Sequence, residues 1–201
     1  PLSSPSFLLS GGCFSALRKM EGKPSANVAK GISLMKLDII GSVASGKTTL
    51  ARKLSAQYRV PFYEKDNIVW ERTPDGDKRR NPEDRDQMFR QILAQEHWIV
   101  EGSPRDILQE SFACCDYIIL LDINTFTRLF RVFRRWLRQR TGRESYNSRP
   151  TLRFLYANLL WVAEFNQKRT QIISSLSVYG DKFKRFNDEK AVLDFVAGKY
   201  G

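Results

Sequence analysis

The chain of 201 residues carries 33 Lys and Arg against 22 Asp and Glu, and its formal net charge at pH 7 is +11. Hydrophobic residues make up 42% of the sequence, which excludes a disordered chain and suffices for the core of one domain. No apolar run approaches the roughly 20 residues of a membrane span. Three cysteines and one histidine argue against a disulfide scaffold and a structural zinc site. We expect a soluble cytoplasmic protein, monomeric or homodimeric, with no membrane partner.

Residues 1–34 differ from the rest of the chain. They are rich in Ser, Gly, Pro and Ala, and their hydrophobic residues follow neither the period of a strand nor that of a helix. The apolar stretch Phe7–Leu9 is too short for a signal peptide, and Met35 directly precedes the first strand-like run. We therefore expect a disordered N-terminal extension over residues 1–34 and one folded domain over residues 35–201.

The domain opens with a phosphate-binding motif. Gly41–Thr48 fits G-x-x-x-x-G-K-[ST] at every position, between a strand-like run and a helical run. Glycines allow the tight backbone path that directs successive N–H groups toward phosphate oxygens. Lys47 would neutralise the β- and γ-phosphates, and the hydroxyl of Thr48 would ligate Mg²⁺. The candidate nucleotide-binding residues of this motif are Gly41, Ser42, Ala44, Ser45, Gly46, Lys47, Thr48 and Thr49.

Strand-like and helical segments alternate along the domain. The expected strands are 36–40, 60–63, 98–100, 117–121 and 182–186. The expected helices are 49–54, 82–95, 105–112, 125–140, 150–176 and 188–196. This alternation predicts an α/β fold in which helices cover both faces of a parallel sheet. Ligands of such sheets bind at the carboxyl ends of the strands, where the phosphate-binding motif also lies.

Acidic side chains follow three of the expected strands. Glu101 and Asp122 each end an apolar strand, and either carboxylate could lie on the metal side of a nucleotide site. Asp66 follows the second strand and could orient an acceptor hydroxyl or act as a general base. For all three, the alternative interpretation is a carboxylate that caps a helix or is solvated. The sequence leaves open which of Glu101 and Asp122 would serve the metal.

Residues 128–153 contain nine arginines and a single acidic residue, Glu144. A spacing of three, four and three places four of these arginines on one face of a helix: Arg128, Arg131, Arg135 and Arg138. Phe126, Phe130, Phe133 and Leu137 share the opposite face, which would be a packed seam if the basic face were merely solvated. The basic face predicts an anion clamp over a triphosphate, with Arg135 in nucleotide binding and Arg138 in catalysis. A groove for nucleic-acid phosphates and a merely solvated basic face are the alternatives.

Four segments together resemble the adenylate-kinase-like P-loop family, and within it most of all the DNA topology modulation proteins. They are the phosphate-binding motif, Asp66 with Ile68-Val69-Trp70, the run Trp98-Ile99-Val100-Glu101-Gly102-Ser103-Pro104-Arg105, and Leu120-Leu121-Asp122 before the arginine-rich helix. The resemblance covers nearly all of residues 35–196. It implies a P-loop NTPase three-layer sandwich, with a five-stranded parallel sheet, helices on both faces and an arginine-rich helical lid.

Positions within these motifs carry roles that the resemblance implies. Lys47 and Thr48 would contact phosphate and Mg²⁺, and Glu101 would be the metal-side acid. Arg105 would contact an acceptor phosphate or the transferring group, and Asp66 would bind the acceptor. Glu101 stands where adenylate kinases have an aspartate, and their acceptor-binding Thr and Arg have no recognisable counterpart here.

The sequence thus predicts an ATP- and Mg²⁺-dependent kinase that acts on a small acceptor, either a nucleotide or a small hydroxyl compound. The candidate catalytic residues are Lys47, Asp66, Arg105 and Arg138. ATP is favoured over GTP because the chain lacks an Asn/Thr-Lys-x-Asp segment after a strand. Two alternatives remain. One is a nucleic-acid-binding regulator that uses the 128–153 arginines and ATP as a switch, and the other is a plain ATPase.

Overall fold

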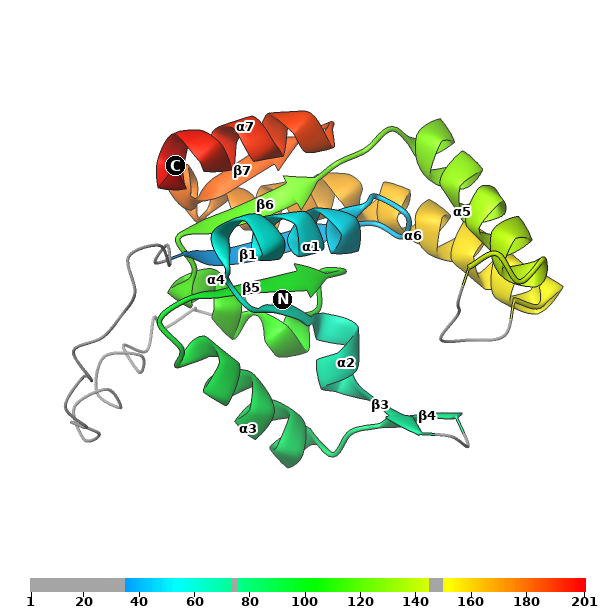
Figure 1. Ribbon diagram of the computed structural model, residues 1–201, viewed down its shortest axis with the longest axis horizontal. Coiled ribbons are helices and arrows are strands. Elements are labelled where there is room, and N and C mark those ends of the chain that lie inside the picture. The colour runs from blue at the N-terminus through cyan, green and yellow to red at the C-terminus, as the bar shows by residue number, and fades with distance from the viewer. Residues whose placement is uncertain (1–34, 74–75, 145–149) are drawn as a thin grey trace, which may run out of the picture. The chain divides into compact units, whose positions relative to one another are not determined.

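The computed structural model describes residues 35–73, 76–144 and 150–201. Its main sheet has five parallel strands in the order β2–β5–β1–β6–β7 (Figure 1). The strands are β1 Lys36–Gly41, β2 Phe62–Glu64, β5 Trp98–Gly102, β6 Tyr117–Leu121 and β7 Phe183–Phe186. The chain builds β2 and β5 on one side of β1 and then β6 and β7 on its other side. The loop after β1 therefore lies where the strand order reverses. The predicted parallel sheet is confirmed.

Helices cover both faces of this sheet, as predicted. The longer helices are α1 Lys47–Tyr58, α3 Pro82–Leu93, α5 Thr125–Arg140, α6 Leu152–Ser177 and α7 Glu189–Tyr200. The short ones are α2 Lys65–Val69, η2 Asp106–Leu108, α4 Glu110–Cys114 and η3 Gly180–Lys182. α1 and α7 pack on one face, and α2, α3, α4 and α6 pack on the other. The chain therefore forms the three-layer sandwich that the sequence predicts.

The central strand shows how the sequence builds two cores. Leu37 and Ile39 are fully buried in the cluster under α1 and α7, whereas Ile40 is buried in the cluster on the other face. Side chains alternate along a strand, so a strand covered on both faces is apolar almost throughout. The exception is Asp38, which is fully buried on the same face as Ile40 and pairs there with Lys65 of α2.

Two parts of the fold were not predicted. The short helix α2 is followed by an antiparallel pair, β3 Trp70–Thr73 and β4 Gly76–Arg79. The strands β3 and β4 are largely exposed and rich in charge, so they lack the alternation of apolar residues that reveals a strand. The predicted helix 105–112 is divided at Gln109 into η2 and α4.

The two helices after β6 form a pair. α5 runs away from the sheet and α6 returns beside it (Figure 1). Arg135 of α5 donates to Asn158 Oδ1 of α6 at 3.0 Å, and Trp136 Nε1 donates to the carbonyl oxygen of Pro150 at 3.0 Å. The packed seam that belongs to the alternative of a solvated basic face is not found, because the buried residues of α5 are Arg128 and Val132. The four residues of that seam, Phe126, Phe130, Phe133 and Leu137, are exposed.

The prediction of a disordered extension over residues 1–34 lies outside the described residues. Within the ranges that the structure describes, no helix is long and apolar enough to cross a membrane.

Candidate active site

The loop after β1 has a backbone path suited to a phosphate group. Gly46 has φ of +101° and Ala44 has φ of +59°, so both lie in the left-handed region that favours glycine. At Gly41, a Cβ atom would lie 2.8 Å from Ser45 Oγ and 2.9 Å from the carbonyl oxygen of Leu121, so β6 leaves no room for a side chain. α1 begins directly after the loop and brings the positive end of its dipole to the same place.

Lys47 is held against this loop. Its Nζ donates a hydrogen bond to the carbonyl oxygen of Ser42 at 3.2 Å. Burial lowers the pKa of Lys47, while the negative charges of Glu101 and Asp66 raise it and oppose that effect. The ammonium group thus bonds the loop and is within electrostatic reach of two carboxylates. A phosphate oxygen could take the place of the Ser42 carbonyl as its partner.

Thr48 and Glu101 join the start of α1 to the end of β5. Thr48 Oγ1 donates to Glu101 Oε1 at 2.6 Å, and Glu101 is only 3% exposed. Its second oxygen, Oε2, is buried without a hydrogen-bond partner among the described residues. Burial raises the pKa of Glu101, and Lys47 and Thr48 oppose that rise.

This donor set fits Mg²⁺. A hydroxyl and a buried carboxylate with an unpaired oxygen supply the hard oxygen ligands that the ion prefers, and Mg²⁺ takes few ligands from protein when phosphates and waters supply the others. The described ranges contain no group of three or more His, Cys, Asp or Glu that could hold a metal ion.

Asp122 is engaged elsewhere. Its carboxylate accepts hydrogen bonds from Arg169 of α6, at 2.9 and 2.8 Å, and from Arg185 of β7, at 2.7 Å. Burial by itself would raise the pKa of Asp122, but the hydrogen bonds from the two arginines outweigh burial and hold it below its ordinary value. The geometry therefore favours Glu101 over Asp122 on the metal side.

The predicted acceptor residues lie together. Arg105, just beyond β5, places its Nη2 2.6 Å from Oδ1 of Asp66 in α2, and its Nε is buried without a hydrogen-bond partner among the described residues. Glu64 ends β2 beside Glu101 of β5 in the parallel register. Both Asp66 and Glu64 affect the pKa of Lys47, so they lie within electrostatic reach of the phosphate loop.

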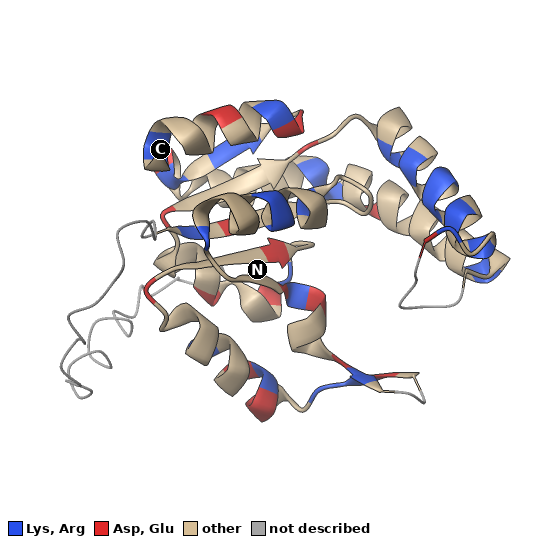
Figure 2. Ribbon diagram, in the orientation of Figure 1, with Lys and Arg blue, Asp and Glu red and all other residues tan. Residues whose placement is uncertain are grey.

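Basic residues occur all along α5 (Figure 2), but their contacts differ from its start to its end. Arg128 Nη1 donates to Ser42 Oγ at 2.5 Å, and Arg131 Nη1 donates to the carbonyl oxygen of Ser45 at 2.9 Å. Arg135 bonds α6 instead, although its positive charge still lowers the pKa of Lys47. The side chain of Arg138 is exposed, and no hydrogen bond or ion pair joins its guanidinium group to another described residue.

Sequence reasoning therefore named the basic face of α5 but singled out its far end. Arg135 and Arg138 lie toward the break at Thr141-Gly142, whereas α5 starts at the edge of the sheet, so Arg128 and Arg131 come closest to the phosphate loop. Glu64 was also missed. The pattern that points to Glu101, an acid directly after a predicted strand, also applies to Glu64.

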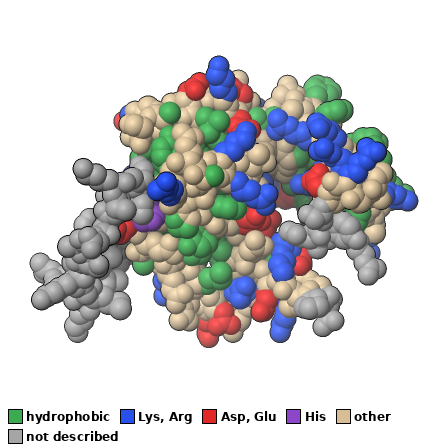
Figure 3. Space-filling view, viewed as in Figure 1, with side chains coloured by type: hydrophobic (Ala, Val, Ile, Leu, Met, Phe, Trp, Pro, Cys, Tyr) green, Lys and Arg blue, Asp and Glu red, His purple; other side chains and the backbone are tan. Residues whose placement is uncertain are grey.

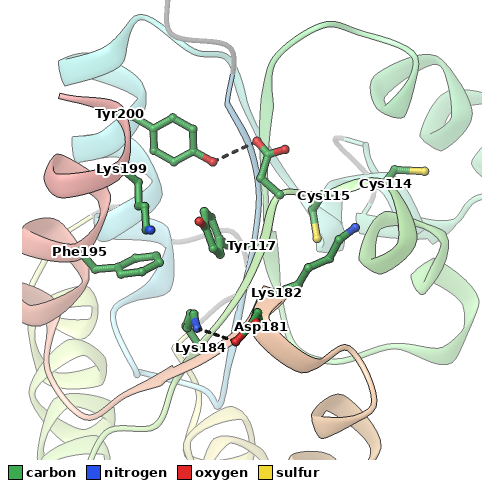
Figure 4. Close-up of a pocket in the computed structure, with 10 residues that line it drawn as sticks. Cys114, Cys115, Tyr117, Asp181, Lys182, Lys184, Phe195, Lys199 and Tyr200 are labelled. Carbon is green, nitrogen blue, oxygen red and sulfur yellow. Dashed lines mark hydrogen bonds and ion pairs between the residues drawn. The ribbon is translucent and has the colours of Figure 1, made fainter.

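A cavity of about 890 Å³ lies at the edge where the strands begin (Figure 4). Tyr117, Lys182, Phe195 and Tyr200 are among its lining residues, and Tyr200 donates to Asp116 Oδ2 at 3.0 Å. Burial raises the pKa of the adjacent Cys115 thiol, which makes it a poor nucleophile. Since parallel sheets bind ligands at the opposite edge, where the strands end, the phosphate loop is the candidate active site.

No protein-family model matches the chain, and no curated protein sequence matches it. A solved structure of shikimate kinase from Acinetobacter baumannii in complex with shikimate is similar over 83% of this chain and 94% of that one, with 13% identity and a TM-score of 0.52. Shikimate kinase from Bacteroides thetaiotaomicron matches 77% of this chain and 87% of its own, with 12% identity and a TM-score of 0.48. An uncharacterized protein from Eubacterium ventriosum matches 81% and 96%, with 15% identity and a TM-score of 0.48.

The likeness to the Acinetobacter baumannii structure shows the fold alone, because only 13% of the residues are identical. The chain thus has the fold of P-loop kinases. The comparisons support this general kinase-like fold and not the topology modulation branch that the sequence motifs resemble.

Proposed function

We propose that the protein is an ATP- and Mg²⁺-dependent phosphotransferase that acts on a small acceptor. The observation that carries the proposal is the hydrogen bond from Thr48 to Glu101 beside Lys47, with the Asp66–Arg105 pair within reach of the same lysine. Phosphoryl transfer needs positioned positive charge, a metal site and a group that orients the nucleophile. At this edge of the sheet, Lys47 would supply the charge, Thr48 and Glu101 the metal site, and Asp66 the orienting group.

Three kinds of group would contact the phosphates of the nucleotide: the loop amides, a lysine and two arginines. The amides of Gly41–Thr48 would bind phosphate oxygens, and Lys47 would exchange its bond to Ser42 for one to a phosphate. Arg131, now bonded to loop carbonyls, and Arg135 would add charge over the transferring group. Thr48 and Glu101 would hold Mg²⁺, which neutralises charge on the phosphates.

A matched substitution tests the metal assignment. Glu101→Gln keeps the shape of the side chain but removes its charge, and we expect the Mg²⁺ concentration for half-maximal ATP binding to rise by about 10- to 100-fold. Fluorescence titration of a labelled ATP analogue with Mg²⁺ measures this shift without turnover. Glu71→Gln, on the exposed strand β3, is the control. An unchanged Mg²⁺ requirement in Glu101→Gln would contradict the assignment.

On the acceptor side, Asp66 would accept the proton of an acceptor hydroxyl, and Arg105 would fix the carboxylate of Asp66 or bind an anionic group of the acceptor. Because the two partners are partly exposed, an acceptor can reach them. A hydroxyl compound or a nucleoside monophosphate both meet this chemistry. The finer resemblance to the topology modulation proteins adds no acceptor to this choice.

The contacts of α5 bear on the nucleic-acid alternative. Arg128 and Arg131 bond the phosphate loop, and Arg135 bonds α6. These arginines of the basic face are therefore directed inward, which supports a clamp on a nucleotide more than a groove for nucleic acid.

The test offers γ-labelled ATP and Mg²⁺ to the protein with separate pools of nucleoside monophosphates and small hydroxyl compounds. Shikimate, which is bound in the Acinetobacter baumannii structure, belongs to the second pool. We expect label to move to one pool, and Asp66→Asn to lower that transfer by about 10²- to 10⁴-fold, which is the usual worth of a general base. ATP binding by Asp66→Asn should be unchanged. Label released only as free phosphate, at the same rate with every pool, would identify a plain ATPase instead.

A further inference from the structure

One helix face of the molecule exposes large apolar side chains. Phe126, Phe130, Phe133 and Leu137 of α5 are 81%, 65%, 53% and 48% exposed. Their spacing of four, three and four places them along one line of the helix, here called the apolar strip. Figure 3 shows green side chains beside the blue arginines along the outer part of α5. Monomeric proteins rarely leave such a set uncovered unless it binds a partner.

The partner helix also exposes apolar side chains. The exposed ones in the first half of α6 are Leu152, Tyr156, Leu159, Leu160 and Trp161. These residues differ from Val132 of α5 and from Asn158 and Val162 of α6, which are buried. Arg135 of α5 donates to Asn158 across the pair. Nine large apolar residues are therefore exposed among the described residues of this pair of packed helices.

The charge around the strip has one sign. α5 contains six arginines and no acidic residue, and α6 has no acidic residue before Glu164. At 100° per residue, Arg134 lies beside the strip on one flank and Arg140 on the other, and both are exposed. Arg128 and Arg131 point instead to the phosphate loop. Away from that loop, the surface thus offers an apolar line with one exposed arginine on each flank, Arg134 and Arg140.

The positive charge around the apolar strip favours some binding partners over others. A second copy would bring two arginine-rich rims together, with only Glu144 of each chain between residues 125 and 153 to neutralise them. Single-stranded nucleic acid binds where basic side chains are interleaved with stacking aromatics, whereas here the two kinds lie on separate lines of the helix. An anionic bilayer fits both, since it takes apolar side chains below its headgroups and holds arginines at its phosphates.

We propose that α5 docks the protein on anionic phospholipid surfaces through the apolar strip and its flanking arginines. A helix of 16 residues is about 24 Å long, enough to lie in the plane of the headgroups with all four strip residues inserted. The arginines that contact the phosphate loop lie on another side of α5, so docking leaves the nucleotide site open. The proposal does not depend on the phosphotransferase reaction.

The test is vesicle co-sedimentation of the full chain. We expect binding to vesicles of phosphatidylcholine mixed with phosphatidylserine, weak binding to phosphatidylcholine alone, and weaker binding as salt rises. The double variant Phe126→Ser/Phe130→Ser should bind the anionic vesicles at least about tenfold more weakly, because two inserted rings are lost. The control is Val178→Ser, which removes an apolar side chain that is 79% exposed outside the helix pair and should bind as the wild type does.

Each other outcome overturns the proposal. Absence of binding to anionic vesicles does so, and so does binding that the double variant retains in full, since charge alone would then be responsible. Light scattering and binding to single-stranded DNA are measured on the same proteins. A dimer that the double variant dissociates, without vesicle binding, would assign the strip to a second copy, and DNA binding lost in the double variant would assign it to nucleic acid. Circular dichroism checks that the variant is folded.

Discussion

Replacing Lys47 by alanine should lower phosphoryl transfer by about 10²- to 10³-fold and leave the protein folded. The expected loss is large because the ammonium group acts in a partly buried place, where a charge stabilises developing charge more than it does in water. A factor of 10³ corresponds to about 4 kcal/mol of transition-state stabilisation. The fold should survive because the Lys47 ammonium group makes one hydrogen bond, to the Ser42 carbonyl. In the variant, the buried carboxylate of Glu101 still accepts the hydrogen bond from Thr48.

Lys53→Ala is the matched control for this variant. Lys53 is also a lysine of α1, but it is exposed and pairs with Glu189 of α7 at 2.6 Å, away from the phosphate loop. We expect Lys53→Ala to keep full activity, because exposed ion pairs contribute only about 0–1 kcal/mol. The measurement is label transfer from γ-labelled ATP, with thermal unfolding recorded for each protein. Full activity in a folded Lys47→Ala protein would reject the phosphotransferase assignment.

The pH profile gives a second view of Lys47 in the same assay. Burial lowers the pKa of this lysine, so its charge is lost at a lower pH than that of an ordinary lysine. As pH rises, phosphoryl transfer by the wild type should therefore begin to fall at a lower pH than it would if Lys47 had the pKa of an ordinary lysine.

Most of the fold can be predicted from short-range patterns in the sequence. The strand alternation, the Gly41–Thr48 motif and the acid at Glu101 are visible in short windows, because strand period, turn glycines and strand-end acids are local properties. The parallel sheet then brings strand ends together whatever the loops between them are. For that reason the sequence predicts Lys47, Thr48 and Glu101 as one site. In the structure Thr48 donates to Glu101, and the charge of Glu101 raises the pKa of Lys47.

The rest depends on which face of an element meets which neighbour. The period of α5 correctly separates its arginines from Phe126, Phe130, Phe133 and Leu137, but a period does not say which side packs on α6. In the same way, Asp122 and Glu101 look alike in sequence. Only the arrival of Arg169 from α6 and Arg185 from β7 distinguishes them.

The buried ion pair of Asp38 is the clearest case of a feature beyond sequence reasoning. Its partners are 27 and 73 residues away: Lys65 Nζ lies 2.8 and 2.6 Å from the two carboxylate oxygens, and Ser111 Oγ donates to Oδ2 at 2.5 Å. Lys65 and Asp38 are fully buried. Gly102 makes room for the lysine, since a Cβ atom there would lie 2.7 Å from Lys65 Cβ. The pair joins β1 to α2, the helix that carries Asp66.

Lys65→Met should lower the free energy of unfolding by about 3–5 kcal/mol, because it leaves the charge of Asp38 buried without its cation. Chemical denaturation with urea measures the change. Lys168→Met is the control, since it breaks an ion pair with Glu164 that is exposed on α6 and should cost no more than about 1 kcal/mol. A loss in Lys65→Met as small as that of the control would contradict the role of the buried pair.

Two further measurements separate lost charge from lost packing. Burial already raises the pKa of Asp38, against the effect of Lys65, and removal of Lys65 should raise it further. When a carboxyl group has a higher pKa in the folded state than in the unfolded state, the folded protein loses stability as pH rises above the unfolded-state pKa, which is about 3.9. Lys65→Met should therefore be least destabilised in mild acid and most destabilised near neutral pH. Asp38→Leu/Lys65→Met should recover most of the loss, since a buried pair can be replaced by apolar residues of similar volume. A double variant as unstable as the single one would mean that the lysine stem, rather than the charge, holds α2 against β1.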